Sequence, residues 1–240
     1  MQRLKSGAEK LGINLSDEQI EKFEVYYREL VEWNKKINLT AITDYEEVQV
    51  KHFLDSLTVA RAINFKGGGA GFKLLDVGTG AGLPGIPLKI AFPEIFLTLL
   101  EATAKKTQFL EHLVKELGLK DMEIITGRAE DMARLPQYRG KFDIVVSRAV
   151  AALPALVELT LPFLVIGGIL IAQKKGVIAE ELRSAGKSVE ILGGRARETK
   201  RVNLEGAGDD RCLVIIDKIK VTPEKYPRRP GMPEKRPISD

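Results

Sequence analysis

The chain has 240 residues, of which 44% are hydrophobic and 29% are charged, which is typical of a globular protein with a sizeable core. The single cysteine, Cys212, excludes an intrachain disulfide, so we expect a reducing, cytoplasmic location. The longest apolar run, residues 161–172, is interrupted by a proline and two glycines, and it is shorter than the roughly 20 residues of a membrane-spanning helix. The composition therefore argues against a membrane protein and against a secreted disulfide-stabilised domain.

Residues 1–66 are predicted to form a helical extension. Ser16 and Gln19 have the spacing of a capping box, and apolar residues recur at helical spacing over residues 20–30. Asp44 is expected to cap a further helix. The apolar stripe of that helix is Val50, Phe53, Leu54 and Leu57. Four glycines within residues 66–71 predict a linker at the end of the extension.

His52, Asp55 and Ser56 share one face of this helix at spacings of three and four residues. The same residue types form hydrolase triads, but a triad nucleophile is usually held on a sharp turn beside an oxyanion hole. We therefore interpret these residues as a polar helix face that packs against the rest of the protein.

Residues 67–220 alternate between apolar strand patterns and helical patterns. Helices are expected notably at residues 105–117 and 151–161. Strands are expected at residues 73–77, 95–100, 122–125, 142–147, 166–172, 189–192 and 212–216. This alternation predicts an α/β fold with a doubly wound, mostly parallel seven-stranded sheet. The last strand follows a polar turn without an intervening helix, so we expect it to be antiparallel.

The glycine-rich segment LLDVGTGAGLPG, residues 74–85, is the most specific local motif. An apolar strand runs into Gly78, Gly80 and Gly82, and Pro84 then suits the first turn of a helix. Glycines allow a tight turn and a close approach of the backbone to a ligand. Because the turn follows a strand of a doubly wound sheet, it predicts a cofactor site.

Two cofactor classes fit this turn. Gly80, Gly82 and Gly85 match the dinucleotide pattern G-x-G-x-x-G, which would make the protein an NAD-linked oxidoreductase. Asp76, just before the turn, favours S-adenosylmethionine, because a carboxylate attracts the ammonium group of that cofactor and repels a pyrophosphate. With either cofactor, Glu101 at the end of the next strand is expected to accept hydrogen bonds from a ribose diol.

Two further segments are candidates for the same site. After the third strand, backbone groups of Ala129 and Glu130 are candidates to contact an adenine edge, although an acid-rich helix start explains the same residues. Arg148, at the end of the fourth strand, has two interpretations. It is expected to contact a ligand or a base, or to form a salt bridge with a nearby acid. We expect no metal, and we identify no catalytic acid or base.

Residues 221–240 are expected to form a basic arm. The net charge of the chain is +4, and residues 218–236 hold seven Lys or Arg against two Asp or Glu. Prolines fix φ and remove backbone donors, so their density here predicts an extended arm without a helix. We expect this arm to lie away from the glycine turn. A polyanion is the expected partner, and a solvated tail is the alternative. The candidate phosphate contacts are Arg228, Arg229, Lys235 and Arg236.

Several segments together resemble the bacterial GidB/RsmG family of small-subunit ribosomal RNA methyltransferases. The resemblance covers nearly the whole chain in the family's order. Its segments are KINLTAI (36–42), HFLDSL (52–57), DVGTGAGLPGIPL (76–88), RAED (128–131), SRAVA (147–151) and residues 210–238, which contain YPRRPGMPEKRPI. Many methyltransferases share the glycine turn, whereas the N-terminal and C-terminal segments are far more specific.

The resemblance implies a Rossmann-like class I methyltransferase fold with an N-terminal helical extension. It also implies methyl transfer from S-adenosylmethionine to guanine N7 in the decoding-centre hairpin of 16S rRNA, as free RNA or within a small-subunit particle. The cofactor residues that it implies are Gly78, Leu83, Glu101, Ala102, Thr103, Ala129, Glu130 and Arg148.

The residues themselves are compatible with an N7 acceptor but do not select it. Cys212 lies in a predicted distal strand, which disfavours C5 methylation of a pyrimidine, and residues 147–151 lack the Asn/Asp-Pro-Pro-aromatic loop of many amine methyltransferases. Guanine N7 is nucleophilic without losing a proton, so its methylation needs alignment more than a base. A different methyltransferase, an NAD-linked oxidoreductase and a non-catalytic RNA-binding protein stay open. A monomer is favoured.

Overall fold

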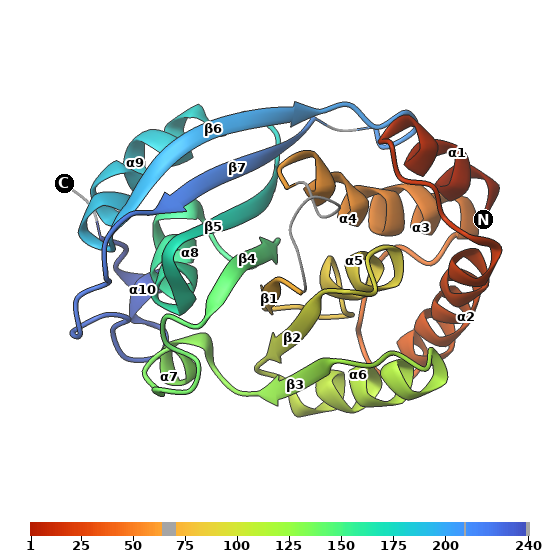
Figure 1. The fold of residues 1–240 in the computed structure, drawn as a ribbon, viewed down its shortest axis with the longest axis horizontal. Coiled ribbons are helices and arrows are strands. Elements are labelled where there is room, and N and C mark those ends of the chain that lie inside the picture. Colours follow the sequence, from red (N-terminus) through yellow and green to blue (C-terminus); the bar gives the residue numbers. More distant parts are fainter. Residues whose placement is uncertain (64–70, 209, 239–240) are drawn as a thin grey trace.

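The computed structural model of the protein describes residues 1–63, 71–208 and 210–238. Its centre is a seven-stranded sheet with the strand order β3-β2-β1-β4-β5-β7-β6 (Figure 1). The strands are β1 (Lys73–Val77), β2 (Phe96–Glu101), β3 (Met122–Thr126), β4 (Phe142–Arg148), β5 (Leu164–Lys175), β6 (Gly194–Val202) and β7 (Arg211–Lys218). Strands β1 to β5 are parallel, and β7 runs antiparallel to both of its neighbours, as expected for the last strand.

Helices cover both faces of this sheet. The helices are α1 (Gln2–Lys10), α2 (Asp17–Asn34), α3 (Tyr45–Val48), α4 (Asp55–Leu57), α5 (Gly85–Ala91), α6 (Ala104–Glu116), α7 (Ala129–Met132), α8 (Leu153–Thr160), α9 (Ala179–Ile191) and α10 (Met232–Lys235). Side chains alternate along each strand, so Leu74 packs with α2, α5 and α6, whereas Leu75 packs with α8 and α9. The sheet is therefore buried on both faces, as its apolar strands require.

The N-terminal extension folds as its sequence predicts and packs onto the sheet. Ser16 and Gln19 form the capping box at the start of α2, and the Asp44 carboxylate caps α3. Between α3 and α4 the chain forms a π-helical segment, Gln49–Leu54. The expected apolar stripe from Val50 to Leu57 is buried. The Tyr26 hydroxyl donates a hydrogen bond to the Ala81 carbonyl, which ties α2 to the glycine turn.

The strand predicted at residues 189–192 is wrong, because these residues form the end of α9 and the turn that follows it. The sixth strand lies at Gly194–Val202, a segment that is mostly charged and exposed. Such a strand lacks the apolar alternation that identifies buried strands, and its charges suit the edge of a sheet, where they oppose pairing with another chain. The predicted linker at residues 66–71 lies mostly outside the described residues.

The C-terminal arm is not extended as predicted. It packs against the protein with Tyr226, Pro227 and Pro233 buried, and it ends in the short helix α10 beside α8 (Figure 1). Pro233 stands in the first turn of α10, where a helix needs no backbone N–H and the ring's fixed φ suits the helix. A dense run of prolines is thus compatible with a folded arm.

Candidate functional site

The glycine turn lies between β1 and α5 at the carboxyl edge of the sheet. Gly78, Gly80 and Gly82 have φ values of +70°, +59° and +92°, which strain any residue with a side chain. A Cβ on Gly78 would lie 2.5 Å from the Val150 side chain, so this position also needs a glycine for space. A Cβ on Gly80 would meet no atom closer than 4.0 Å, so the backbone there faces open space.

Asp76 braces this turn from within the core. Its side chain is fully buried, and Oδ2 accepts hydrogen bonds from the Thr79 hydroxyl at 2.7 Å and the Gly85 N–H at 2.8 Å. Among the described residues, Oδ1 has no hydrogen-bond partner, which is uncommon for a buried carboxylate. Burial raises the pKa of Asp76 to about 6, against the hydrogen bonds from Thr79 and Gly85, which lower it.

Glu101 joins the ends of β1 and β2. One carboxylate oxygen accepts the Gly80 N–H at 3.0 Å, and the other accepts the Thr103 N–H at 2.9 Å. The side chain is only 6% exposed, so these two bonds fix its orientation. Each carboxylate oxygen retains the capacity to accept another hydrogen bond. The arrangement is suited to two adjacent hydroxyl donors.

A hollow at this edge brings together several of the predicted cofactor residues. We call it the carboxyl-edge hollow, and it is lined by Val77, Gly78, Leu100, Ala102, Gly127, Arg128, Ala129, Glu130, Val150, Leu159 and Glu234. Asp76, Gly80, Leu83, Glu101 and Thr103 do not line the hollow. Glu101 and Thr103 flank its lining residue Ala102, and Asp76 precedes its lining residue Val77. The sequence analysis did not identify Leu159 and Glu234, since nothing in its motifs predicts that α8 and the arm approach the glycine turn. Val150 lies within the SRAVA segment but was not named as a site residue.

Arg148 lies in a different pocket, with Gln173, Lys174 and Arg211 among its lining residues. Its guanidinium forms an ion pair with Asp55 at 3.0 Å, and Arg211 pairs with the other oxygen of Asp55 at 2.6 Å. The salt-bridge alternative for Arg148 is thus present in the structure. Because Asp55 belongs to the N-terminal extension, these pairs fasten that extension to β4 and β7.

His52, Asp55 and Ser56 do not form a catalytic triad. The Ser56 hydroxyl donates to the His52 carbonyl, and His52 Nε2 lies 2.7 Å from the Thr40 hydroxyl. Burial and the nearby Arg148 lower the pKa of His52 to about 4, so the imidazole is neutral at physiological pH. These residues pack the extension onto the sheet, as the sequence predicts.

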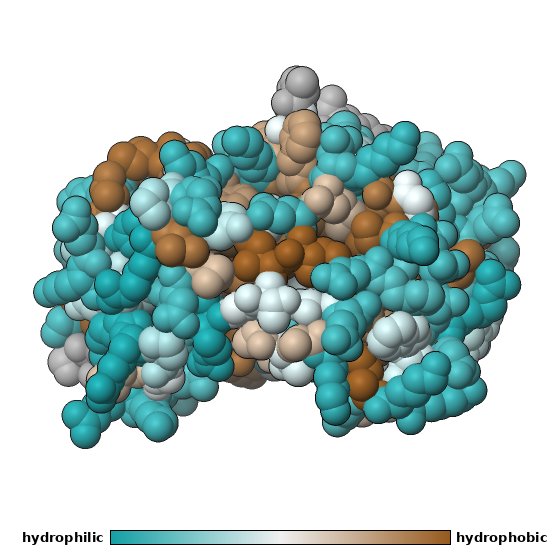
Figure 2. Space-filling view, turned by 90° about the horizontal axis from the view of Figure 1, so that it is seen from below, coloured by the Kyte–Doolittle hydropathy of each residue, from teal (hydrophilic) through white to brown (hydrophobic). Residues whose placement is uncertain are grey.

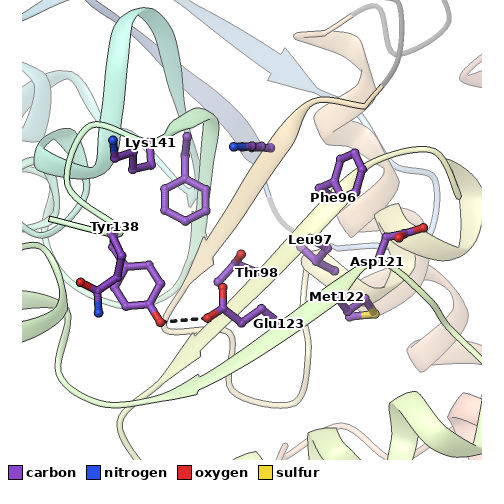
Figure 3. A pocket seen from close by; sticks show the side chains of 11 residues that line it. Phe96, Leu97, Thr98, Asp121, Met122, Glu123, Tyr138 and Lys141 are labelled. Atoms are coloured by element: carbon purple, nitrogen blue, oxygen red, sulfur yellow. Dashed lines mark hydrogen bonds between the residues drawn. The ribbon is translucent and has the colours of Figure 1, made fainter. Parts of the chain in front are cut away.

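A second concavity lies at the opposite, amino edge of the sheet. Phe96, Thr98 and Glu123 line it from β2 and β3, and the Tyr138 hydroxyl donates to Glu123 at 2.8 Å (Figure 3). Figure 2 shows the face that carries β3, α6 and α7, where apolar side chains gather across the middle between hydrophilic ones. None of the predicted site residues lies in this groove, so the candidate cofactor site is at the carboxyl edge.

The basic residues of the arm differ in their surroundings. The Arg228 guanidinium is paired with the fully buried Glu158 carboxylate, at 2.7 Å for the shortest contact. Arg229, Lys235 and Arg236 are exposed. The arm therefore carries one inward-facing arginine, which the sequence did not distinguish from the three exposed cations.

The strand order, the antiparallel β7 and the glycine turn after β1 define a class I methyltransferase fold. Residues 19–211 match the family described as rRNA small subunit methyltransferase G, and the chain belongs to this family. A protein of Dehalococcoides mccartyi named ribosomal RNA small subunit methyltransferase G is 53% identical over 99% of this chain and 100% of its own length. One of the same name from Alkaliphilus metalliredigens is 46% identical over 98% of this chain and 97% of its own.

Solved structures agree with the fold. Precorrin-6y C5,15-methyltransferase of Geobacter metallireducens superposes with a TM-score of 0.51 at 16% identity, covering 78% of this chain and 96% of that one. The [4+2]-cyclase SpnF superposes with a TM-score of 0.55 at 16% identity, covering 86% and 97%. A cyclase on this fold shows that the architecture alone does not determine the reaction.

Within the described ranges, no helix is long and apolar enough to cross a membrane. The same part of the chain holds no group of three or more His, Cys, Asp or Glu placed to ligate a metal ion.

The raised pKa of Asp76 predicts a pH dependence of stability. Between its ordinary value of 3.8 and about 6, the folded protein binds more protons at this carboxyl than the unfolded chain does. Stability from this group is therefore present at low pH and is lost as the pH rises through about 6. Urea unfolding measures the free energy of unfolding at pH 4.5 and at pH 7. From the lower to the higher pH, this free energy should fall by about 2 kcal/mol more in the wild type than in Asp76→Asn. Equal pH dependence in the two proteins would contradict the assignment.

Proposed function

We propose that the protein transfers a methyl group from S-adenosylmethionine to N7 of a guanine in the decoding-centre hairpin of 16S rRNA. The observation that carries the cofactor assignment is the Asp76 carboxylate, buried behind the glycine turn with an unpartnered oxygen among the described residues. Membership of the rRNA small subunit methyltransferase G family supports the RNA substrate.

The residues at the carboxyl edge fit S-adenosylmethionine better than NAD. Asp76 favours a cationic ligand end and would repel a pyrophosphate brought to the same turn. Glu101 has two oxygens held in place to accept hydrogen bonds from a ribose diol. Ala102 and Ala129 line the hollow beside the turn, where an adenine ring would be covered. When bound, the cofactor supplies an electrophilic methyl group on its sulfonium.

The chain's own residues suit an acceptor that loses no proton before attack. Burial raises the pKa of the Cys212 thiol, and Cys212 is the second residue of β7, which β4 and β5 separate from β1 and the glycine turn, so it is a poor nucleophile for C5 methylation. Arg148, at the end of β4, is paired with Asp55. Guanine N7 requires the lone pair to be aligned with the methyl group, which binding supplies.

Substituting Glu101 with alanine tests the cofactor site. The variant loses a charged acceptor for the ribose and also the brace between Gly80 and Thr103, so affinity for S-adenosylhomocysteine should fall about ten- to a hundredfold. Calorimetry measures this affinity. Glu123→Gln, at the opposite edge of the sheet, is the matched control and should bind as wild type does. Unchanged affinity in Glu101→Ala would exclude this role for Glu101.

Replacing the target guanine with 7-deazaguanine tests the acceptor atom. This base keeps the shape and the Watson–Crick edge of guanine but lacks the nitrogen that attacks. Single-turnover methyl transfer to the substituted RNA should be abolished, while the RNA still binds the enzyme. Transfer at the normal rate would disprove N7 as the acceptor, and loss of binding to an otherwise identical RNA would point to a contact at N7 rather than to chemistry.

Neutralising the exposed arm residues tests the RNA contact. Arg229, Lys235 and Arg236 are free to meet phosphates, whereas Arg228 is paired with Glu158. The triple glutamine variant should weaken RNA binding and flatten the dependence of log K on log salt by about 0.7 for each lost single-strand contact. Three exposed arginines of β6, Arg195, Arg197 and Arg201, provide a charge-matched control. An unchanged salt slope in the arm variant would refute an RNA contact by the arm.

A further inference from the structure

The first half of the C-terminal arm is fastened by two arginines that follow α7. The Arg139 guanidinium donates to the carbonyls of Thr222 and Tyr226, each at 2.9 Å. Arg134 donates to the carbonyls of Lys225 and Pro227. Arg139 also donates to the Pro223 carbonyl at 3.2 Å. Five backbone acceptors of the arm are therefore bound by two side chains of one loop, which fixes the path of the arm across the protein.

The second half of the arm is fastened by two glutamates. The fully buried Glu158 of α8 accepts the Arg228 backbone N–H at 2.7 Å and pairs with the Arg228 guanidinium through both carboxylate oxygens. Glu130 of α7, only 2% exposed, accepts the Gly231 N–H at 2.8 Å. Burial raises the pKa of Glu130, but the hydrogen bonds from Gly231 and Arg128 outweigh it, so the pKa lies below its usual value. The Glu130 carboxylate that accepts the Gly231 N–H is thus ionised at physiological pH.

These contacts place α10 at the carboxyl-edge hollow. Glu234 of α10 lines the hollow together with Gly78, Ala102 and Ala129, although some 150 residues separate it from the glycine turn. Glu130 does two things at once, because the residue lines the hollow and its carboxylate holds Gly231. The sequence analysis expected the arm to lie away from the glycine turn. The structure instead places α10 at the hollow beside this turn.

We propose that the C-terminal arm is a wall of the cofactor site and that Glu158 is the positioning residue that holds this wall in place. This inference rests on the proposed function, since it names S-adenosylmethionine as the ligand that the wall covers. A segment whose outer face carries Arg229, Lys235 and Arg236 then forms, on its inner side, part of the pocket for the methyl donor. The RNA and the cofactor would meet the same short segment.

The first test removes the charge pair between Glu158 and Arg228. Glu158→Gln combined with Arg228→Gln leaves no unpaired buried charge, which limits the loss of global stability. The double variant should bind S-adenosylhomocysteine at least about fivefold more weakly, a change in the range of typical coupling between sites. KM for S-adenosylmethionine should rise while kcat at saturation changes little. Glu224→Gln, an exposed glutamate on the same arm, is the control.

Amide hydrogen exchange of Gly231 shows whether the arm has been released. Its N–H is held by Glu130 in the wild type, so exchange should be faster in the double variant. Faster exchange with unchanged cofactor affinity would overturn the inference, because the wall would have moved without effect. Unchanged exchange would overturn the role of Glu158. Wild-type protein that fails to bind S-adenosylhomocysteine would instead refute the proposed function, and the inference with it.

A second variant keeps the test decisive if the double variant does not fold. Glu234→Trp adds bulk at the rim of the hollow without disturbing a buried residue, because Glu234 is exposed on α10. It should weaken binding of S-adenosylhomocysteine at least about fivefold, comparable to typical couplings between sites. Glu224→Trp places the same bulk on the arm before Tyr226 and should bind as wild type does. Equal affinities for the two tryptophan variants would show that α10 does not bound the site.

Discussion

The buried carboxylate of Asp76 is the interaction on which the glycine turn depends. A backbone that passes through three left-handed positions within five residues leaves amides that no regular element satisfies. Asp76 accepts the Gly85 N–H at the start of α5 and the Thr79 hydroxyl within the turn, so one side chain holds both ends of the loop. The same carboxylate retains an oxygen without a partner among the described residues, and a cationic ligand would complete it. The group that supports the turn is thus also the one on which the proposed cofactor assignment rests.

A second buried carboxylate, Asp55, attaches the N-terminal extension to the sheet. It lies between Arg148 of β4 and Arg211 of β7, and the three side chains are largely buried. Burying a single charge costs free energy, but the Asp55 carboxylate is compensated by the two arginines. Removing any one of these three side chains would leave the remaining charges buried with less compensation. Arg148 ends its strand at the carboxyl edge. The ion pairs of Asp55 therefore attach the N-terminal extension to this edge, in addition to the packing of its apolar stripe.

Local sequence patterns predicted most of the fold and part of the site. Strands β1 to β5 and β7 were identified because apolar runs and turn residues are local signals, and Asp76, Gly80 and Glu101 followed from their positions at strand ends. The strand β6 was missed because its residues, Arg195 among them, are charged and exposed and carry no hydrophobic period. The ion-pair partners of Arg148 and Arg228 could not be predicted from the sequence either. Pairing with Asp55 or Glu158 depends on which elements the fold brings together, and neither spacing along the chain nor charge contains that information.

The arm shows why charge alone is an incomplete guide to a binding surface. Arg228 and Arg229 are adjacent and chemically identical, yet one is paired with a buried carboxylate and the other is exposed. Both residues lie in an irregular segment, and the backbone of this segment directs one side chain to the buried Glu158 and the other to the solvent. The prolines that appeared to hold the arm away from the protein instead limit the backbone N–H groups that packing must satisfy, and those of Arg228 and Gly231 meet glutamates. An arm built in this way exposes cations on its outer side while Glu234 lines the carboxyl-edge hollow.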